Sequence, residues 1–143
     1  MQDFLSVRGF LFALGLVWRL KEGASFLWMA PVCSSFSWMS RSCTKRSKAY
    51  PNGDQCRKSV RDGNIMIARC MLMILFANAK KITWALEQPM NATSMYLDRF
   101  QSMLTMVAAH TGLVYLKPFG AYTSKPLRSS SQRFVLSAFV ICS

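Results

Sequence analysis

Several features are scarce in this sequence, and each absence excludes a class of protein. The 143-residue chain has six acidic residues against 18 lysines and arginines, and a single histidine. No apolar run reaches the ~18 residues that a membrane-spanning helix needs, so we expect no transmembrane segment. Its five cysteines include no C-x-x-C pair and are irregularly spaced, which predicts neither a zinc site nor a disulfide framework. We therefore expect no metal, reduced cysteines and an intracellular protein, nuclear or cytoplasmic.

Apolar residues and positive charge, by contrast, are abundant. Hydrophobic residues make up 52% of the chain, which indicates a folded core rather than a disordered chain. The formal net charge of +12 favours a polyanionic partner, of which nucleic acid, and DNA in particular, is the first candidate. The length fits one domain.

Helical and strand patterns alternate along the chain. Helices are expected over 5–21, 64–79 and 96–110, and strands over 25–30, 82–86, 113–116 and 133–142. This order predicts an α/β fold with a mostly parallel sheet and helices on both faces. The apolar run 10–18 could also be read as a signal-peptide core, but Asp3 stands where a basic segment should be, so the helix is favoured. We divide the single domain into an N-terminal helix (1–24), a basic loop (32–62), the remaining core (63–126) and a tail (127–143).

The basic loop, residues 32–62, differs in kind from the rest of the chain. It is rich in serine, holds seven of the 18 basic residues and contains the turn signal PNGD at 51–54. Loops of this length inside a domain are usually functional or disordered. The candidate nucleic-acid-binding residues are Arg41, Lys45, Arg46, Lys48, Arg57 and Lys58. The alternative interpretation is a solvated charged segment without a ligand.

Two residues with chemical potential follow the first two predicted strands. Cys33 comes after the strand 25–30, and Glu87 comes after the strand 82–86. Active groups in parallel sheets lie beyond the carboxyl ends of the strands, so we expect these two side chains near one another. A thiolate beside a protonated carboxyl suits covalent attack on an electron-poor ring whose nitrogen the acid protonates. The alternatives are a buried structural cysteine and a capping or ion-paired carboxylate.

The residues around this pair carry a family resemblance. The segments APVCSSF (30–36) and LEQP (86–89) resemble the catalytic half of the cytosine-C5 DNA methyltransferases. Extended to residues 125–126, the pattern also resembles a group of uncharacterised protist proteins. The resemblance implies a Rossmann-like domain in which Cys33 attacks C6 of a flipped cytosine and Glu87 protonates N3, with the basic loop facing DNA. It also implies S-adenosylmethionine as the methyl donor.

One part of that family pattern is missing. The glycines before Cys33 are Gly9, Gly15 and Gly23, and none follows a predicted strand, so no glycine-rich S-adenosylmethionine loop is found. We therefore expect an incomplete methyltransferase-like domain that transfers no methyl group alone. Two alternatives stay open: a non-catalytic basic module that binds nucleic acid, and a truncated gene product without a stable function.

Overall fold

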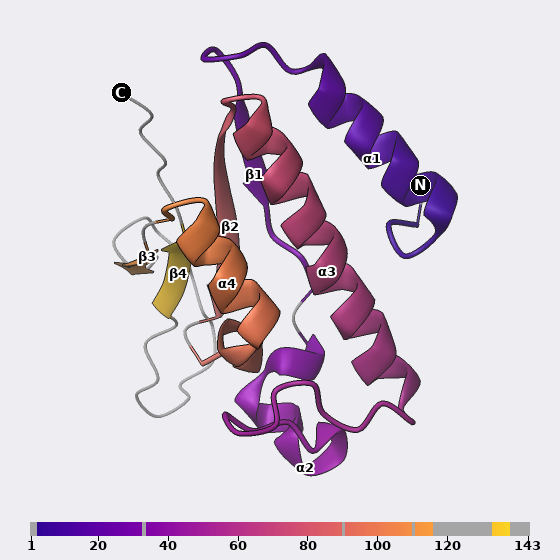
Figure 1. Ribbon diagram of the computed structural model, residues 1–143. Coiled ribbons are helices and arrows are strands. Elements are labelled where there is room, and N and C mark those ends of the chain that lie inside the picture. The colour runs from indigo at the N-terminus through magenta and orange to yellow at the C-terminus, as the bar shows by residue number, and fades with distance from the viewer. Residues whose placement is uncertain (1–2, 33, 90, 110, 116–132, 138–143) are drawn as a thin grey trace, which may run out of the picture.

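A mixed sheet backed by helices organises the chain. The computed structural model describes residues 3–32, 34–89, 91–109, 111–115 and 133–137. Its strands are β1 (Phe26–Met29), β2 (Thr83–Pro89), β3 (Thr111–Tyr115) and β4 (Arg133–Ser137), in the spatial order β1-β2-β4-β3. The longer helices are α1 (Val7–Arg19), α3 (Lys58–Ala79) and α4 (Asp98–Met106). Figure 1 shows α3 in front of β1 and β2, between α1 and α4.

The sheet is only partly parallel, and the prediction of a mostly parallel sheet is wrong for the described strands. β1 and β2 pair in parallel with Met29 opposite Leu86, as the alternating pattern predicts. β4, however, pairs antiparallel with both β2 and β3, and it inserts between them. The described residues thus form a mixed helix–strand fold in which one strand pair is parallel, and they contain no complete Rossmann-like sheet.

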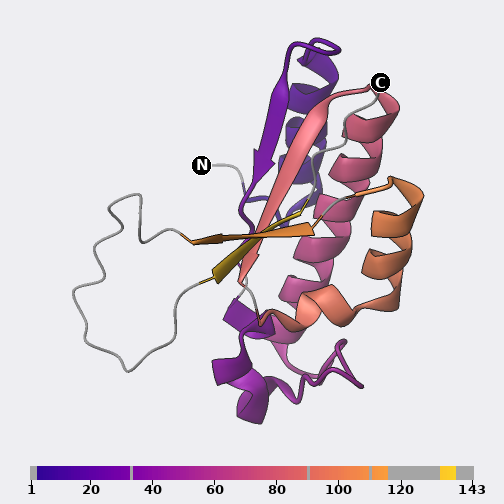
Figure 2. The same cartoon turned by 90° about the vertical axis from the view of Figure 1, so that its left-hand side faces the viewer.

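Among the described residues, α3 and α4 cover the same face of the β1–β2 pair (Figure 2), which differs from the expectation of helices on both faces. Figure 2 shows α3 and α4 on the same side of these strands. On that side Leu27 and Met29 pack with the core residues Trp84 and Leu86. The alternate β1 residues, Phe26 and Trp28, are about half exposed, with ring centroids 6.2 Å apart.

The core lies between α3, α4 and the covered sheet face. α3 contributes a stripe of buried residues at helical spacing, namely Ile67, Cys70, Ile74 and Ala77. α4 adds the face predicted from the sequence: Leu97, Phe100, Leu104 and Val107 are all buried. Several predicted helices and strands are therefore confirmed with modest shifts of their ends. No helix among the described residues is both long and apolar enough to cross a membrane.

The segment 32–62 is not one long loop. It contains the short helices η1 (Ser34–Phe36), η2 (Trp38–Ser40) and α2 (Arg41–Thr44), and α3 begins within it at Lys58. The unit docks at the N-terminal end of α3 (Figure 1), where Gly63 allows close approach. A Cβ atom at Gly63 would lie 2.2 Å from Ser35 Oγ and 3.3 Å from the Phe36 ring. We call residues 34–62 the basic unit.

Candidate functional site

Arg46 lies inside the basic unit rather than on its surface. It is 2% exposed, and its guanidinium donates hydrogen bonds to the carbonyls of Pro51 (2.5 Å) and Val60 (3.1 Å). The guanidinium also packs over the Phe36 ring, 3.8 Å from the centroid. Burial, and secondarily the positive charge of Arg99, lowers the pKa of Arg46 to about 10, so it stays charged at neutral pH.

This arrangement gives Arg46 a structural role. No carboxylate in the described part of the chain lies within ion-pair distance of it. The guanidinium instead ties the turn at Pro51 to the first turn of α3, and its contact with Phe36 ties both to η1. Arg46 was predicted to contact nucleic acid, but its burial makes it the residue that shapes the surface presented by its neighbours.

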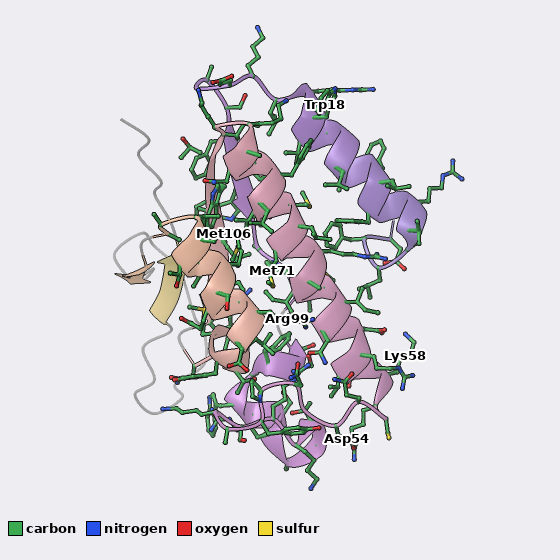
Figure 3. The ribbon with its side chains drawn as sticks, viewed as in Figure 1. Trp18, Asp54, Lys58, Met71, Arg99 and Met106 are labelled. Atoms are coloured by element: carbon green, nitrogen blue, oxygen red, sulfur yellow. The ribbon has the colours of Figure 1, made fainter. Side chains whose placement is uncertain are left out.

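The other predicted basic residues lie at or near the surface. Lys45, Lys48, Arg57 and Lys58 are exposed, and Arg41 is half-buried. Two of the four exposed residues have acidic partners: Arg57 lies 3.5 Å from Asp54, and Lys58 lies 2.8 Å from Asp62. Figure 3 shows Lys58 at the end of α3 and Asp54 in the preceding turn. Lys45 and Lys48 have no carboxylate partner among the described residues, which leaves their charge available to an anion.

Exposed aromatic rings accompany these charges, and the sequence predictions missed them. Trp38 and Tyr50 are more than half exposed, and Tyr96, in η3 (Thr93–Tyr96), is 42% exposed. The Lys48 ammonium lies 5.3 Å from the centroid of the Tyr96 ring. Exposed rings beside lysines are the combination that binds unpaired bases and phosphates. The sequence could have indicated the exposed rings of the basic unit. Aromatic residues within a serine- and lysine-rich stretch have too few apolar neighbours to bury them.

A further arginine, also missed from the sequence, approaches the basic unit from α4. Arg99 donates a hydrogen bond to the Asn64 carbonyl at 3.4 Å, and it lies where α4 faces α3 (Figure 3). Its charge contributes to the lowered pKa of Arg46. Positive charge from two distant segments therefore gathers at this end of α3.

Of the predicted catalytic pair, the structure describes Glu87. Glu87 is half-buried and lies within β2, one residue beyond the last pairing with β1, rather than after the strand. Its backbone is paired on the other side with Leu136 of β4. Cys33 lies outside the described residues. The parallel pairing does bring the end of β1, which leads toward Cys33, beside Glu87.

The described residues do not fit a family-type S-adenosylmethionine loop. Gly9 and Gly15 lie in α1, and Gly23 lies in the turn before β1 with φ +67°, so no glycine follows a strand before Cys33. The described part of the chain also contains no group of three or more His, Cys, Asp or Glu side chains that could hold a metal ion.

Comparison with known proteins does not place this chain in a family. No protein-family model, no curated protein and no solved structure matches it.

Proposed function

We propose that the basic unit binds nucleic acid through phosphate contacts and ring stacking. The observation that carries the proposal is the exposure of Lys45 and Lys48, which form no ion pair with any described residue, on a folded unit that also exposes Trp38 and Tyr50. Lysines bind phosphates with a strong dependence on salt, and exposed rings stack on bases of any sequence. The proposal favours single-stranded DNA over duplex, because only unpaired bases can stack on these rings.

The buried Arg46 supports this function indirectly. A surface loop with seven basic residues would repel itself and stay mobile unless its backbone were tied down. The bonds from Arg46 to Pro51 and Val60 fix the turn that carries Lys48 and Tyr50. Binding then costs less conformational entropy than it would for a free loop.

The test is a titration of a labelled 20-nucleotide single strand followed by fluorescence anisotropy, at several salt concentrations. Lys45→Ala with Lys48→Ala should weaken binding about tenfold and reduce the slope of log affinity against log salt by about 1.4. The matched control removes two exposed basic residues elsewhere, Arg19→Ala with Lys21→Ala. If both double variants lose affinity equally, binding reflects net charge alone, and the proposed site is wrong.

A second candidate function is covalent chemistry on cytosine by Cys33 and Glu87. It is favoured by the parallel pairing of β1 with β2, which sets the chain leading to Cys33 beside Glu87. The Cys33 thiolate would form a carbon–sulfur bond at C6 while the Glu87 carboxyl gives its proton to N3. The addition is balanced and reversible, and it needs no methyl donor.

The covalent step can be tested separately from binding. An oligonucleotide carrying 2-pyrimidinone in place of cytosine is more electron-poor at C6 and should trap the thiolate as an adduct seen by intact mass spectrometry. Cys33→Ser should abolish the adduct and Glu87→Gln should slow its formation. Cys43→Ser is the matched control, because Cys43 is a free, exposed thiol in the basic unit. An adduct that depends on Cys43 instead, or none with wild type, contradicts this second function and leaves the binding proposal standing.

A further inference from the structure

The outer face of α1 is apolar and exposed. Five large hydrophobic side chains of this helix are each at least 48% exposed: Val7, Leu11, Phe12, Leu16 and Trp18. The opposite side of the helix buries Gly9 and Val17. An ordinary surface helix places polar residues outward, whereas α1 has apolar residues on both sides. Such a contiguous exposed patch marks an interaction surface.

An open groove continues this apolar face onto α3. The groove encloses about 410 Å³ between the two helices and is lined by Phe10, Leu14, Gly15, Trp18, Leu72 and Phe76. Trp18 and Phe76 stack with centroids 5.9 Å apart and planes 10° from parallel. Leu72 is itself half exposed, so the apolar surface spans both helices.

Two cations on α3 hold α1 in place at its ends. Arg69 donates to the carbonyls of Phe4 (2.5 Å) and Ser6 (2.9 Å), just before the helix begins. Lys80 donates to the carbonyls of Trp18 and Leu20, where the helix ends. The apolar face is therefore presented by a fixed helix and not by a flexible arm.

The charges on this helix are positive. Arg8 and Arg19 are the charged residues of α1, both exposed, and Lys21 follows at its end. Two acids flank the helix: Glu22 is ion-paired with Lys81 at 3.3 Å, and Asp3, which accepts a hydrogen bond from the Leu5 N–H, lies just before α1. Exposed apolar side chains with an arginine near each end of the helix complement the acyl chains and anionic headgroups of a lipid surface.

We propose that α1 and the adjoining groove form a docking surface for an anionic membrane. The 13-residue helix lies flat in the headgroup region, with Leu11, Phe12 and Leu16 immersed and Trp18 at the boundary. The net charge of +12 opposes the alternative that a second copy of the chain covers the face. The surface lies beside the C-terminal half of α3, away from the basic unit at its other end (Figure 1), so the inference does not depend on nucleic-acid binding.

Vesicle co-sedimentation of the full chain tests the proposal. Vesicles of phosphatidylcholine with about 30% phosphatidylserine should bind the protein, and pure phosphatidylcholine should bind it far more weakly. Leu11→Ser, Phe12→Ser and Leu16→Ser together should lower partitioning about 100-fold, because three apolar side chains no longer enter the bilayer. These side chains are exposed, so circular dichroism should show an unchanged fold.

A matched pair of charge variants separates docking through α1 from diffuse attraction. Arg8→Gln with Arg19→Gln should lower partitioning roughly 25-fold, at about fivefold for each charge near the surface. Lys45→Gln with Lys48→Gln removes the same charge from the basic unit and should change it little. The proposal is overturned if the two charge pairs reduce vesicle partitioning equally. It is also overturned if the triple serine variant binds vesicles as well as wild type does, or if wild type does not bind them. A wild-type dimer, seen by ultracentrifugation, that the triple variant converts to a monomer would overturn it as well.

Discussion

Replacing Arg46 by methionine removes the interaction that holds the basic unit together while keeping most of the side-chain volume. The substitution leaves the carbonyls of Pro51 and Val60 without the guanidinium donor and removes the cation from the Phe36 ring. Because methionine fills much of the same space, little cavity forms. The change in the free energy of unfolding therefore reports the polar contacts of Arg46 and the cost of burying its charge.

The magnitude follows from opposing contributions. Hydrogen bonds from a charged donor contribute about 2 kcal/mol each, and the contact with the ring about 1 kcal/mol. Against them stand desolvation of the guanidinium and repulsion from Arg99, which together lower the pKa of Arg46 to about 10 and cost about 3 kcal/mol. We expect Arg46→Met to lower the free energy of unfolding by about 2 kcal/mol.

Urea denaturation followed by tryptophan fluorescence measures this loss. Lys45→Met is the matched control, because it removes the same charge from the adjacent, exposed position, and should change the free energy of unfolding by less than about 0.5 kcal/mol. If Arg46→Met is as stable as this control, or more stable than wild type, the guanidinium does not hold the basic unit together and the reasoning is refuted.

Three further predictions test other parts of the structure. Burial lowers the pKa of Arg46 to about 10 in the folded chain, below its unfolded value, so the cost of burial is present in full below the folded pKa and is relieved above it. Wild-type stability relative to Arg46→Met should therefore rise by about 1.4 kcal/mol from about pH 8 to about pH 11 in urea titrations, and a fall would contradict the burial. By the same assay, Gly53→Ala should lower the free energy of unfolding by more than about 2 kcal/mol, because φ is +65° and the new Cβ would lie 2.6 Å from Arg46 Cγ. The control Gly23→Ala has a similar φ of +67° but open space around the Cβ, so it should lower the free energy of unfolding by about 1 kcal/mol. Equal losses from the two variants would refute the contact with Arg46. Lys80→Met should speed amide hydrogen exchange in the last turn of α1, while Lys81→Met, which loses only an exposed ion pair, should not.

The sequence predicted local structure better than it predicted the arrangement of the sheet. The helical spacing of Leu97, Phe100, Leu104 and Val107 identified the buried face of α4, because periodicity reports burial directly. Strand order has no such local signal. The insertion of β4 between β2 and β3 depends on pairing between distant segments, so alternation along the chain gave the wrong proportion of parallel pairs.

The basic unit shows a second limit of sequence reasoning. Helices of three or four residues are too short to produce a periodic pattern, so 32–62 was interpreted as one loop. Arg46 could not be distinguished from its exposed neighbours, because arginine is seldom buried and its burial depends on carbonyls that only the folded chain brings together. The position of Glu87 beside the end of β1, by contrast, followed from the parallel pairing of two neighbouring strands, which was predicted.

The central claim is that nucleic acid binds on the basic unit, and photocrosslinking tests it most directly. A single strand containing 5-bromodeoxyuridine would be irradiated with the protein, and the cross-linked peptides would be mapped by mass spectrometry. We predict cross-links at the exposed rings Trp38, Tyr50 or Tyr96, competed by unlabelled single strands. Cross-links confined to α1 and β1, or none at all, would contradict the claim.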